Sequence, residues 1–235
     1  MTPISGKDTA AIFDVDRTLC ATRSSTSLVW LRRRQHPAWR HCLWLSSLLW
    51  RAPIAMLADG VGRHHADRML YAQFEGLSLK QLEEDAQRCC EELLLPACYP
   101  AALAEVAMHK KAGRRLILLS GGIDLVLRPL AQVLGAELLA QRLVADGDRL
   151  TGEYRSYQML ENESVVSLQG INKMRALRHY AQAVGIDLAN SFAYGDSIND
   201  APVLAAVGRP VAINPDRRLG QIARARNWDV RRWRL

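Results

Sequence analysis

Two aspartates one residue apart, Asp14 and Asp16, lie at the end of a short apolar run, and Thr18 follows them. The run from Ala10 to Val15 is typical of a buried strand, and open α/β sheets bind ligands at the carboxyl ends of their strands. Alternation along the strand would send both carboxylates to one side, where they repel unless a cation or a shared proton intervenes. Mg²⁺ suits such a site, because it prefers carboxylate, water and phosphate oxygens. Aspartates that merely form a turn are the alternative, and this motif alone does not separate the two.

A second apolar run, from Leu116 to Leu119, ends in Ser120, Gly121 and Gly122. This end of a strand offers a hydroxyl and open backbone N–H groups, which together can bind an anion. Taken alone, the serine could equally cap a helix.

Lys173 and a later acidic stretch complete the set of polar groups. The lysine comes near the start of a segment with helical apolar spacing, and Asp196, Asn199 and Asp200 follow a third apolar strand. A surface lysine and aspartates in turns or caps are the structural alternatives. Those alternatives would require independent coincidences at several strand ends, so the joint pattern favours a phosphate and metal site.

Turn and cap residues place these groups on alternating strands and helices. Strands that alternate with helices predict a parallel sheet with right-handed crossovers. Glycines at 113, 135 and 185 are expected to end three of the helices, and Asp146-Gly147-Asp148 predicts a hairpin. The expected elements are helices over 101–111, 123–134, 171–184 and 199–207, a strand over 191–194, an edge strand over 211–213, and a last helix capped by Asn214-Pro215-Asp216.

The four stretches, in this order, resemble the haloacid dehalogenase (HAD) superfamily of phosphohydrolases, and within it the phosphoserine-phosphatase-like branch, subfamily IB. The resemblance covers nearly the whole chain. It implies an α/β fold with a Rossmann-like parallel sheet core and an inserted α-helical cap. Residues 1–19 and 99–235 are then the catalytic core and residues 20–98 the cap. One position departs from the pattern, since Arg17 stands where the superfamily commonly has glycine.

The resemblance implies a Mg²⁺-dependent phosphomonoesterase that works through an aspartyl-phosphate on Asp14. Asp16 would protonate the leaving oxygen and then deprotonate the hydrolytic water. Lys173 and Ser120 would balance the charge of the phosphoryl oxygens, with the Gly121 N–H beside them. The implied site residues are Asp14, Asp16 and Lys173 for catalysis, Ser120, Gly121, Asn199 and Arg17 for substrate binding, and Asp14, Asp16 through its backbone carbonyl, Asp196 and Asp200 for the metal.

The amino-acid composition indicates the kind of partner and the cellular location. With 235 residues, 49% of them apolar, the chain can bury a large core, and its net charge of +7 favours anionic partners. The five cysteines show no metal-binding spacing and are interpreted as reduced thiols, and Met1 to Thr9 lacks a secretory signal, so the expected location is cytoplasmic. The basic C-terminal segment lacks a recognisable binding module, so no nucleic-acid partner is expected.

The span from Arg17 to Ala58 is basic and rich in tryptophan. It holds seven arginines, no Asp or Glu, and the four tryptophans Trp30, Trp39, Trp44 and Trp50. One interpretation is a helical cap with a solvated face. The other is an interfacial element at the inner membrane face, because tryptophan favours the boundary and arginine is drawn to anionic lipid. The uninterrupted apolar part is too short to span a bilayer.

The sequence leaves several classes of substrate open. A phosphoserine enzyme of this branch carries a glutamate shortly after the first motif, and the stretch Ala21-Thr22-Arg23-Ser24 has no acid. The basic, tryptophan-rich cap favours a lipid-linked or amphipathic phosphate, and its layout resembles that of HAD-type phosphatidylglycerophosphate phosphatases. The alternatives are a small-metabolite phosphatase of the phosphoserine or histidinol phosphate type, a phosphotransferase, and a membrane-associated scaffold that has lost the reaction.

Overall fold

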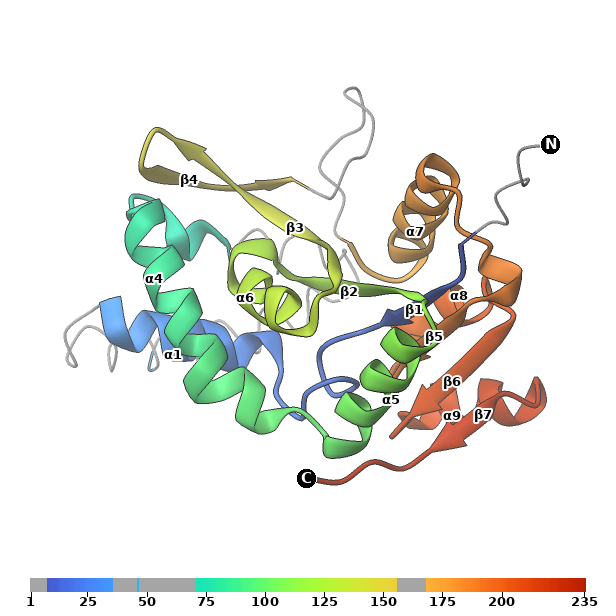
Figure 1. Cartoon of the computed structure of the whole chain (residues 1–235). Coiled ribbons are helices and arrows are strands. Elements are labelled where there is room, and N and C mark those ends of the chain that lie inside the picture. Colours follow the sequence, from blue (N-terminus) through green and yellow to red (C-terminus); the bar gives the residue numbers. More distant parts are fainter. Residues whose placement is uncertain (1–7, 36–45, 47–70, 156–167) are drawn as a thin grey trace.

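The computed structural model describes residues 8–35, 46, 71–155 and 168–235 (Figure 1). Within this part, seven strands form one sheet in the order β4-β3-β2-β1-β5-β6-β7. All neighbours run parallel except β3 and β4, which form an antiparallel hairpin. The strands are β1 (Ala10–Phe13), β2 (Arg115–Ile123), β3 (Glu137–Asp146), β4 (Arg149–Arg155), β5 (Phe192–Gly195), β6 (Arg209–Ile213) and β7 (Asp229–Arg231). This is the predicted α/β fold with a Rossmann-like sheet.

Helices cover both faces of the sheet (Figure 1). The helices are α1 (Ser24–Gln35), α4 (Leu79–Cys89), α5 (Pro100–Lys111), α6 (Asp124–Leu134), α7 (Ile171–Val184), α8 (Ala201–Leu204) and α9 (Arg217–Ala225). Shorter turns are η2 (Ala72–Phe74), the π turn η3 (Cys90–Leu94), η4 (Leu95–Ala97), η5 (Leu188–Asn190) and η6 (Ile198–Asp200). Alternation along β1 explains the layers: Ala11 and Phe13 pack toward α5 and α6, whereas Ala10 and Ile12 pack toward α7, α8 and α9.

Most of the predicted elements are present, including the hairpin at Asp146–Asp148 and the helix that carries Lys173. Two predictions are wrong. The strand over 211–213 is not at the edge, because the three-residue strand β7 pairs outside it. The helix predicted over 199–207 is instead the tight turn η6 followed by α8, which begins at Ala201 because Pro202 fits the first turn of a helix.

The described part of the segment 20–98 is helical and packs against α6 and the β3–β4 hairpin. Leu28, Leu82 and Cys89 from this segment share one buried cluster with Val126 of α6 and Tyr154 of β4. The chain enters and leaves the segment side by side, since the Ala21 N–H donates to the Ala97 carbonyl at 2.8 Å and the Tyr99 N–H to the Leu19 carbonyl at 3.0 Å. The division into core and cap at 1–19, 99–235 and 20–98 stays a prediction.

The basic, tryptophan-rich span is described only in part. Trp39, Trp44 and Trp50 lie outside the described residues, whereas Trp30 is half-buried on α1 and packs against the cluster below it. The Arg34 guanidinium lies 5.0 Å from the centre of the Trp30 ring and 3.3 Å from the Asp85 carboxylate. Trp30 and Arg34 therefore serve packing within the helical segment.

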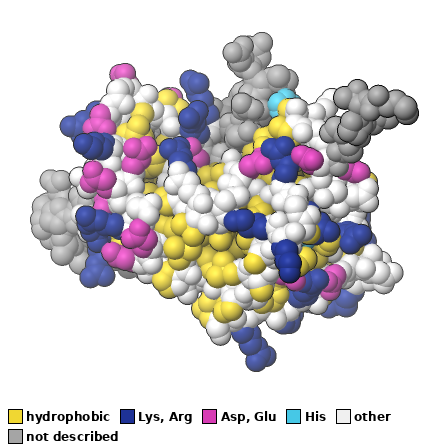
Figure 2. All heavy atoms as spheres, in the orientation of Figure 1, with side chains coloured by type: hydrophobic (Ala, Val, Ile, Leu, Met, Phe, Trp, Pro, Cys, Tyr) yellow, Lys and Arg dark blue, Asp and Glu magenta, His cyan; other side chains and the backbone are white. Residues whose placement is uncertain are grey.

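Figure 2 shows acidic and basic side chains interspersed around a central apolar area on the viewed face, in the region of α5 and α6. Leu103 and Met108 on α5 and Val133 on α6 are exposed apolar side chains. The net charge of +7 is therefore not gathered on this face. Among the described helices, none combines the length and the apolarity needed to cross a membrane.

Candidate active site

Asp14 directly follows β1, in the middle of the sheet. Its backbone N–H donates to the Tyr194 carbonyl on β5 at 3.0 Å, which extends the pairing of the two strands by one residue. Its side chain is 9% exposed. The apolar strand buries this carboxylate at the carboxyl edge of a parallel sheet, which is the ligand-binding edge of such folds.

Lys173 joins Asp14 to a second carboxylate. Its Nζ donates to Asp14 Oδ1 at 2.5 Å and to Asp200 Oδ1 at 2.8 Å, and the lysine is itself buried in the first turn of α7. A buried ammonium is tolerated only when it is paired and hydrogen-bonded, as it is here. Asp14, Lys173 and Asp200 therefore form one charged unit from three segments far apart in the sequence.

The charges in this unit shift one another's protonation. Burial raises the pKa of Asp14 well above its usual value of 3.8, and Asp200 and Asp16 raise it further, while Lys173 opposes the shift. Burial alone would lower the pKa of Lys173, but the Asp14 and Asp200 carboxylates raise it above its usual value. Lys173 therefore stays charged and stabilises the ionised form of Asp14.

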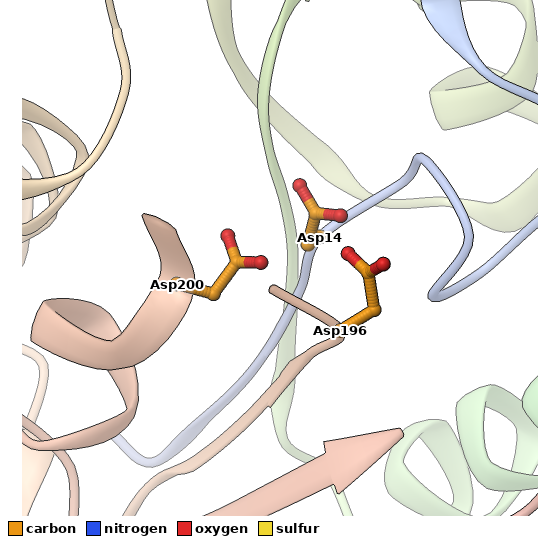
Figure 3. Close-up of side chains that lie close together, drawn as sticks. All are labelled: Asp14, Asp196 and Asp200. Carbon is orange, nitrogen blue, oxygen red and sulfur yellow. The ribbon is translucent and has the colours of Figure 1, made fainter. Parts of the chain in front are cut away.

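Asp196 follows β5 and brings a third carboxylate to the same place. Figure 3 shows the side chains of Asp14, Asp196 and Asp200 turned toward one another. One oxygen of each lies within 4.8 Å of the others, and all three residues are buried. Burial, followed by the nearby Asp200, raises the pKa of Asp196 to about 7, and Arg17 opposes this. Three crowded carboxylates are hard oxygen donors that suit Mg²⁺, so the donor set fits the implied metal.

Asp200 is held in place from both sides. While Lys173 contacts its Oδ1, the Ser197 N–H and hydroxyl donate to its Oδ2 at 3.2 and 2.9 Å. Gly195 makes room for it, because a Cβ at that position would lie 2.5 Å from the Asp200 Cβ. Both oxygens of Asp200 thus serve protein donors.

Asp216 supports the loop that carries Asp196, a role that the sequence analysis missed. It is the predicted cap of the last helix, since its Oδ1 accepts from the Leu219 N–H at 2.7 Å. In addition, its Oδ2 accepts from the Ile198 N–H at 3.0 Å, and its own N–H donates to the Asp196 carbonyl at 2.8 Å. The sequence signal for a helix cap was visible, but its second contact depends on tertiary packing.

Asp16 points to the helical segment rather than to the other carboxylates. Its Oδ2 accepts from the Ser24 N–H at 2.8 Å and from the Ser24 hydroxyl at 2.6 Å, at the first residue of α1. Burial raises the pKa of Asp16, and these two hydrogen bonds oppose the shift. Its side chain does not belong to the carboxylate cluster of the described residues. Ser24 was not predicted as a site residue.

Arg17 lies beside the cluster and adopts a left-handed backbone with φ of 61°. Its Nη1 lies 3.5 Å from Asp196 Oδ2, and its side chain is 41% exposed. Glycine adopts this conformation at lower cost than arginine, which is in keeping with the glycine that the superfamily commonly has at this position. The guanidinium is thus in contact with the site and open to solvent.

The predicted anion-binding residues Ser120, Gly121 and Gly122 lie in the last part of β2, where its pairing with β3 shifts register between Leu119 and Ile123. The Ser120 hydroxyl is buried and accepts from the Gly122 N–H at 3.1 Å, which leaves its own proton to donate. The Gly121 carbonyl accepts from the Tyr71 hydroxyl at 3.0 Å, so a residue of the helical segment contacts the last part of β2. Asn199 is half-buried on η6, next to Asp200. Tyr71 was not predicted, because nothing in the local sequence marks it.

Comparison with known proteins adds the family context. The model of the haloacid dehalogenase-like hydrolases matches residues 11–205. An inhibition of morphological differentiation protein from Streptomyces azureus is 32% identical over 227 residues, which cover 94% of this chain and 77% of that protein. A phosphoserine phosphatase from Mycobacterium tuberculosis is 30% identical over 234 residues, 96% of this chain and 71% of that one.

The fold is also found among solved structures. A phosphoserine phosphatase solved as a phospho-aspartyl intermediate analogue has a TM-score of 0.63 to this chain at 19% identity, covering 95% of this chain and 92% of that chain. At this level of identity, the likeness supports the fold alone.

Proposed function

The chain belongs to the haloacid dehalogenase-like hydrolases and is a phosphoric monoester hydrolase of that family, and from this premise we propose that Asp14 is its nucleophile. The observation that carries the proposal is the buried Asp14–Lys173–Asp200 unit at the carboxyl edge of the sheet. An ordinary core does not bury this many charges, so the arrangement favours a catalytic purpose.

In the proposed reaction, Asp14 Oδ attacks phosphorus and the ester P–O bond breaks. Asp16 gives its proton to the leaving oxygen, which departs as an alcohol. Water then attacks the aspartyl-phosphate, Asp16 takes the proton of that water, and inorganic phosphate leaves with Asp14 restored. The protonated form that Asp16 needs for the first step is favoured by its burial.

Ser120, the Gly121 N–H and Lys173 are proposed to hold the phosphoryl oxygens while charge moves between the attacking and leaving groups. Asp14, Asp196 and the backbone carbonyl of Asp16 would hold Mg²⁺, which when bound neutralises phosphoryl charge. Asp200 is assigned to the second layer of the metal site, because its two oxygens already accept from Lys173 and Ser197. Asn199 and Arg17 are assigned to substrate binding.

The test compares wild type with Asp14→Asn in phosphate release from p-nitrophenyl phosphate, with Mg²⁺ and after its removal by a chelator. Asp146→Asn, at an exposed position of the hairpin, is the matched control. We expect release that needs both Mg²⁺ and Asp14, and a phosphoryl group trapped on the wild-type chain by acid quenching. Release by Asp14→Asn at the wild-type rate would contradict the proposal.

For the substrate class, we propose a lipid-linked or amphipathic phosphate at the cytoplasmic membrane face. The net charge and the acid-free basic span from Arg17 to Ala58 support it. Purified protein is expected to sediment with anionic vesicles and to hydrolyse a phosphate ester embedded in them. Neither binding nor altered activity with such vesicles would refute this part and leave the hydrolase chemistry standing.

A small-metabolite phosphatase is the second candidate, favoured by the relative named a phosphoserine phosphatase. Turnover of phosphoserine or histidinol phosphate in preference to amphipathic esters would select it. Capture of the phosphoryl group by an added alcohol in place of water would indicate a phosphotransferase. Absence of any Mg²⁺-dependent release would point to a scaffold.

A further inference from the structure

A small pocket of about 20 Å³ lies between the helical segment and α6, and Asp16 and Gly122 form part of its wall. This volume holds roughly one water molecule. The pocket therefore begins where two parts of the proposed site meet, the carboxyl of the general acid and the last residues of β2.

The rest of the wall is largely aliphatic. Its apolar members come from α1, η3, the end of β2 and α6, and each is no more than 8% exposed. They are Leu28, Leu94, Ile123, Val126 and Leu127.

The side-chain hydroxyls in the wall are already engaged, that of Ser27 with the Cys89 thiol. The Tyr71 hydroxyl donates to the Gly121 carbonyl at 3.0 Å, and the Ser24 hydroxyl donates to Asp16 at 2.6 Å. Among the described residues that line the pocket, Asp16 is the only one with a charged side chain. A substrate carboxylate there would lose its water shell without gaining a partner, and an ammonium would meet only the Asp16 carboxyl, which must carry a proton to act as the acid, so a charged group in the pocket is unfavourable.

The position of the pocket tells which part of a substrate would enter it. Asp16 protonates the leaving oxygen in the proposed reaction, so the carbon bonded to that oxygen lies next to Asp16. We infer that this pocket receives the first carbons of the leaving alcohol, and that the substrate is a phosphate monoester of an alcohol whose carbons nearest the phosphate are aliphatic and uncharged. This inference rests on the proposed function, since it assumes that Asp16 is the general acid.

The inference is tested with a series of n-alkyl phosphates, from methyl to octyl, kept below their micelle concentrations, with wild-type protein and Mg²⁺. The first one or two carbons that enter the pocket are each expected to raise kcat/KM by about fourfold, after which a pocket of this volume is full and longer chains should gain nothing more from it. Propyl phosphate and phosphoethanolamine have the same number of non-hydrogen atoms and differ by a terminal charge. We expect propyl phosphate to be favoured by about tenfold or more.

A matched pair of variants assigns the effect to the pocket. Val126 faces the pocket from α6, whereas Val133 on the same helix is 56% exposed. Val126→Ala should move the optimum to a longer chain, because it removes two methyl groups from the wall, while Val133→Ala should leave the series unchanged. Should Val126→Ala fail to fold, the wild-type series still decides.

The outcomes distinguish failure of this inference from failure of the proposed hydrolase function. A flat response to chain length, or a preference for phosphoethanolamine or phosphoserine, would overturn the inference while Asp14-dependent hydrolysis stands. No Asp14-dependent release from any ester, p-nitrophenyl phosphate included, would overturn both. Octyl phosphate offered in neutral vesicles or in solution distinguishes the source: faster turnover from vesicles indicates a membrane lipid, and equal turnover a soluble ester.

Discussion

Lys173→Met isolates the charge of the lysine from its bulk, because the methionine chain fills similar space without the ammonium. In the wild type, the ammonium lies 2.5 Å from Asp14 Oδ1 and 2.8 Å from Asp200 Oδ1. The two acidic side chains are 9% and 5% exposed, so in the variant they would face each other with little water. Removing one partner of a buried ion pair costs about 3–5 kcal/mol, and we expect a loss of that size in the free energy of unfolding at pH 8 without metal.

The same electrostatic argument predicts how the loss in the free energy of unfolding depends on pH. Burial already raises the pKa of Asp14, and loss of Lys173 removes the group that opposes this shift. The variant should therefore take up a proton at this pair on folding, and its deficit relative to wild type should shrink as the pH falls toward 5. Saturating Mg²⁺ should also shrink the deficit, since a cation beside the carboxylates replaces part of the missing charge.

Urea unfolding followed by circular dichroism, at pH 5 and pH 8, with Mg²⁺ or a chelator, measures these differences. Lys111→Met, at an exposed position near the end of α5, is the matched control and should cost little under any condition. A deficit of the same size at both pH values would show that the lysine acts through packing, and would refute the electrostatic account.

Two further predictions concern other parts of the core. Burial, followed by the nearby Arg114, lowers the pKa of His109 from 6.5 to about 4. As the pH falls, the unfolded chain therefore binds a proton at this histidine before the folded chain does. The free energy of unfolding should consequently fall by about 3 kcal/mol between pH 6.5 and pH 4. Urea unfolding of His109→Gln across this range should lack that part of the fall, and an unchanged slope would contradict the assignment. Gly195→Ala places a methyl group 2.5 Å from the Asp200 Cβ and should lower kcat about tenfold or more by displacing that carboxylate from Lys173. Gly220→Ala in α9, where a new methyl group would lie 3.8 Å from its nearest neighbour, Pro215 Cγ, should keep full activity and equal or greater stability. Equal kcat in both variants would count against a role for Asp200 in positioning Lys173.

The sequence predicts the parts of the site that depend on local pattern. A strand followed by polar residues is visible around Asp14, Ser120 and Asp196, and Lys173 is placed by the helical spacing after it. Parallel strands bring their carboxyl ends to one edge, so the meeting of these groups follows from the fold class once the strand order is known. The strand β7 has no such pattern, because three residues are too few to show alternation.

The contacts that hold the site together could not be predicted in this way. Ser24 binds Asp16, Tyr71 binds the Gly121 carbonyl near the end of β2, and Asp216 binds the Ile198 N–H, across 8, 50 and 18 residues of chain. Serine and aspartate are common at helix starts, and tyrosine is common in cores. The residue types alone therefore do not mark these contacts in the sequence. Which of them meets a site residue is decided by the packing of the helical segment and α9 on the sheet.

The balance of charge in the site explains the raised pKa values of its carboxylates. Asp14, Asp196 and Asp200 contribute three negative charges when ionised, and among the described residues the cations in contact with them are Lys173 and Arg17. Arg17 is partly exposed, so its pairing with Asp196 is weakened by solvent. The protein groups therefore undercompensate the carboxylates, in keeping with the raised pKa values of Asp14 and Asp196. A divalent cation would reverse this shortage and favour the ionised, nucleophilic form of Asp14, so metal binding and readiness of the nucleophile are coupled by the same electrostatics.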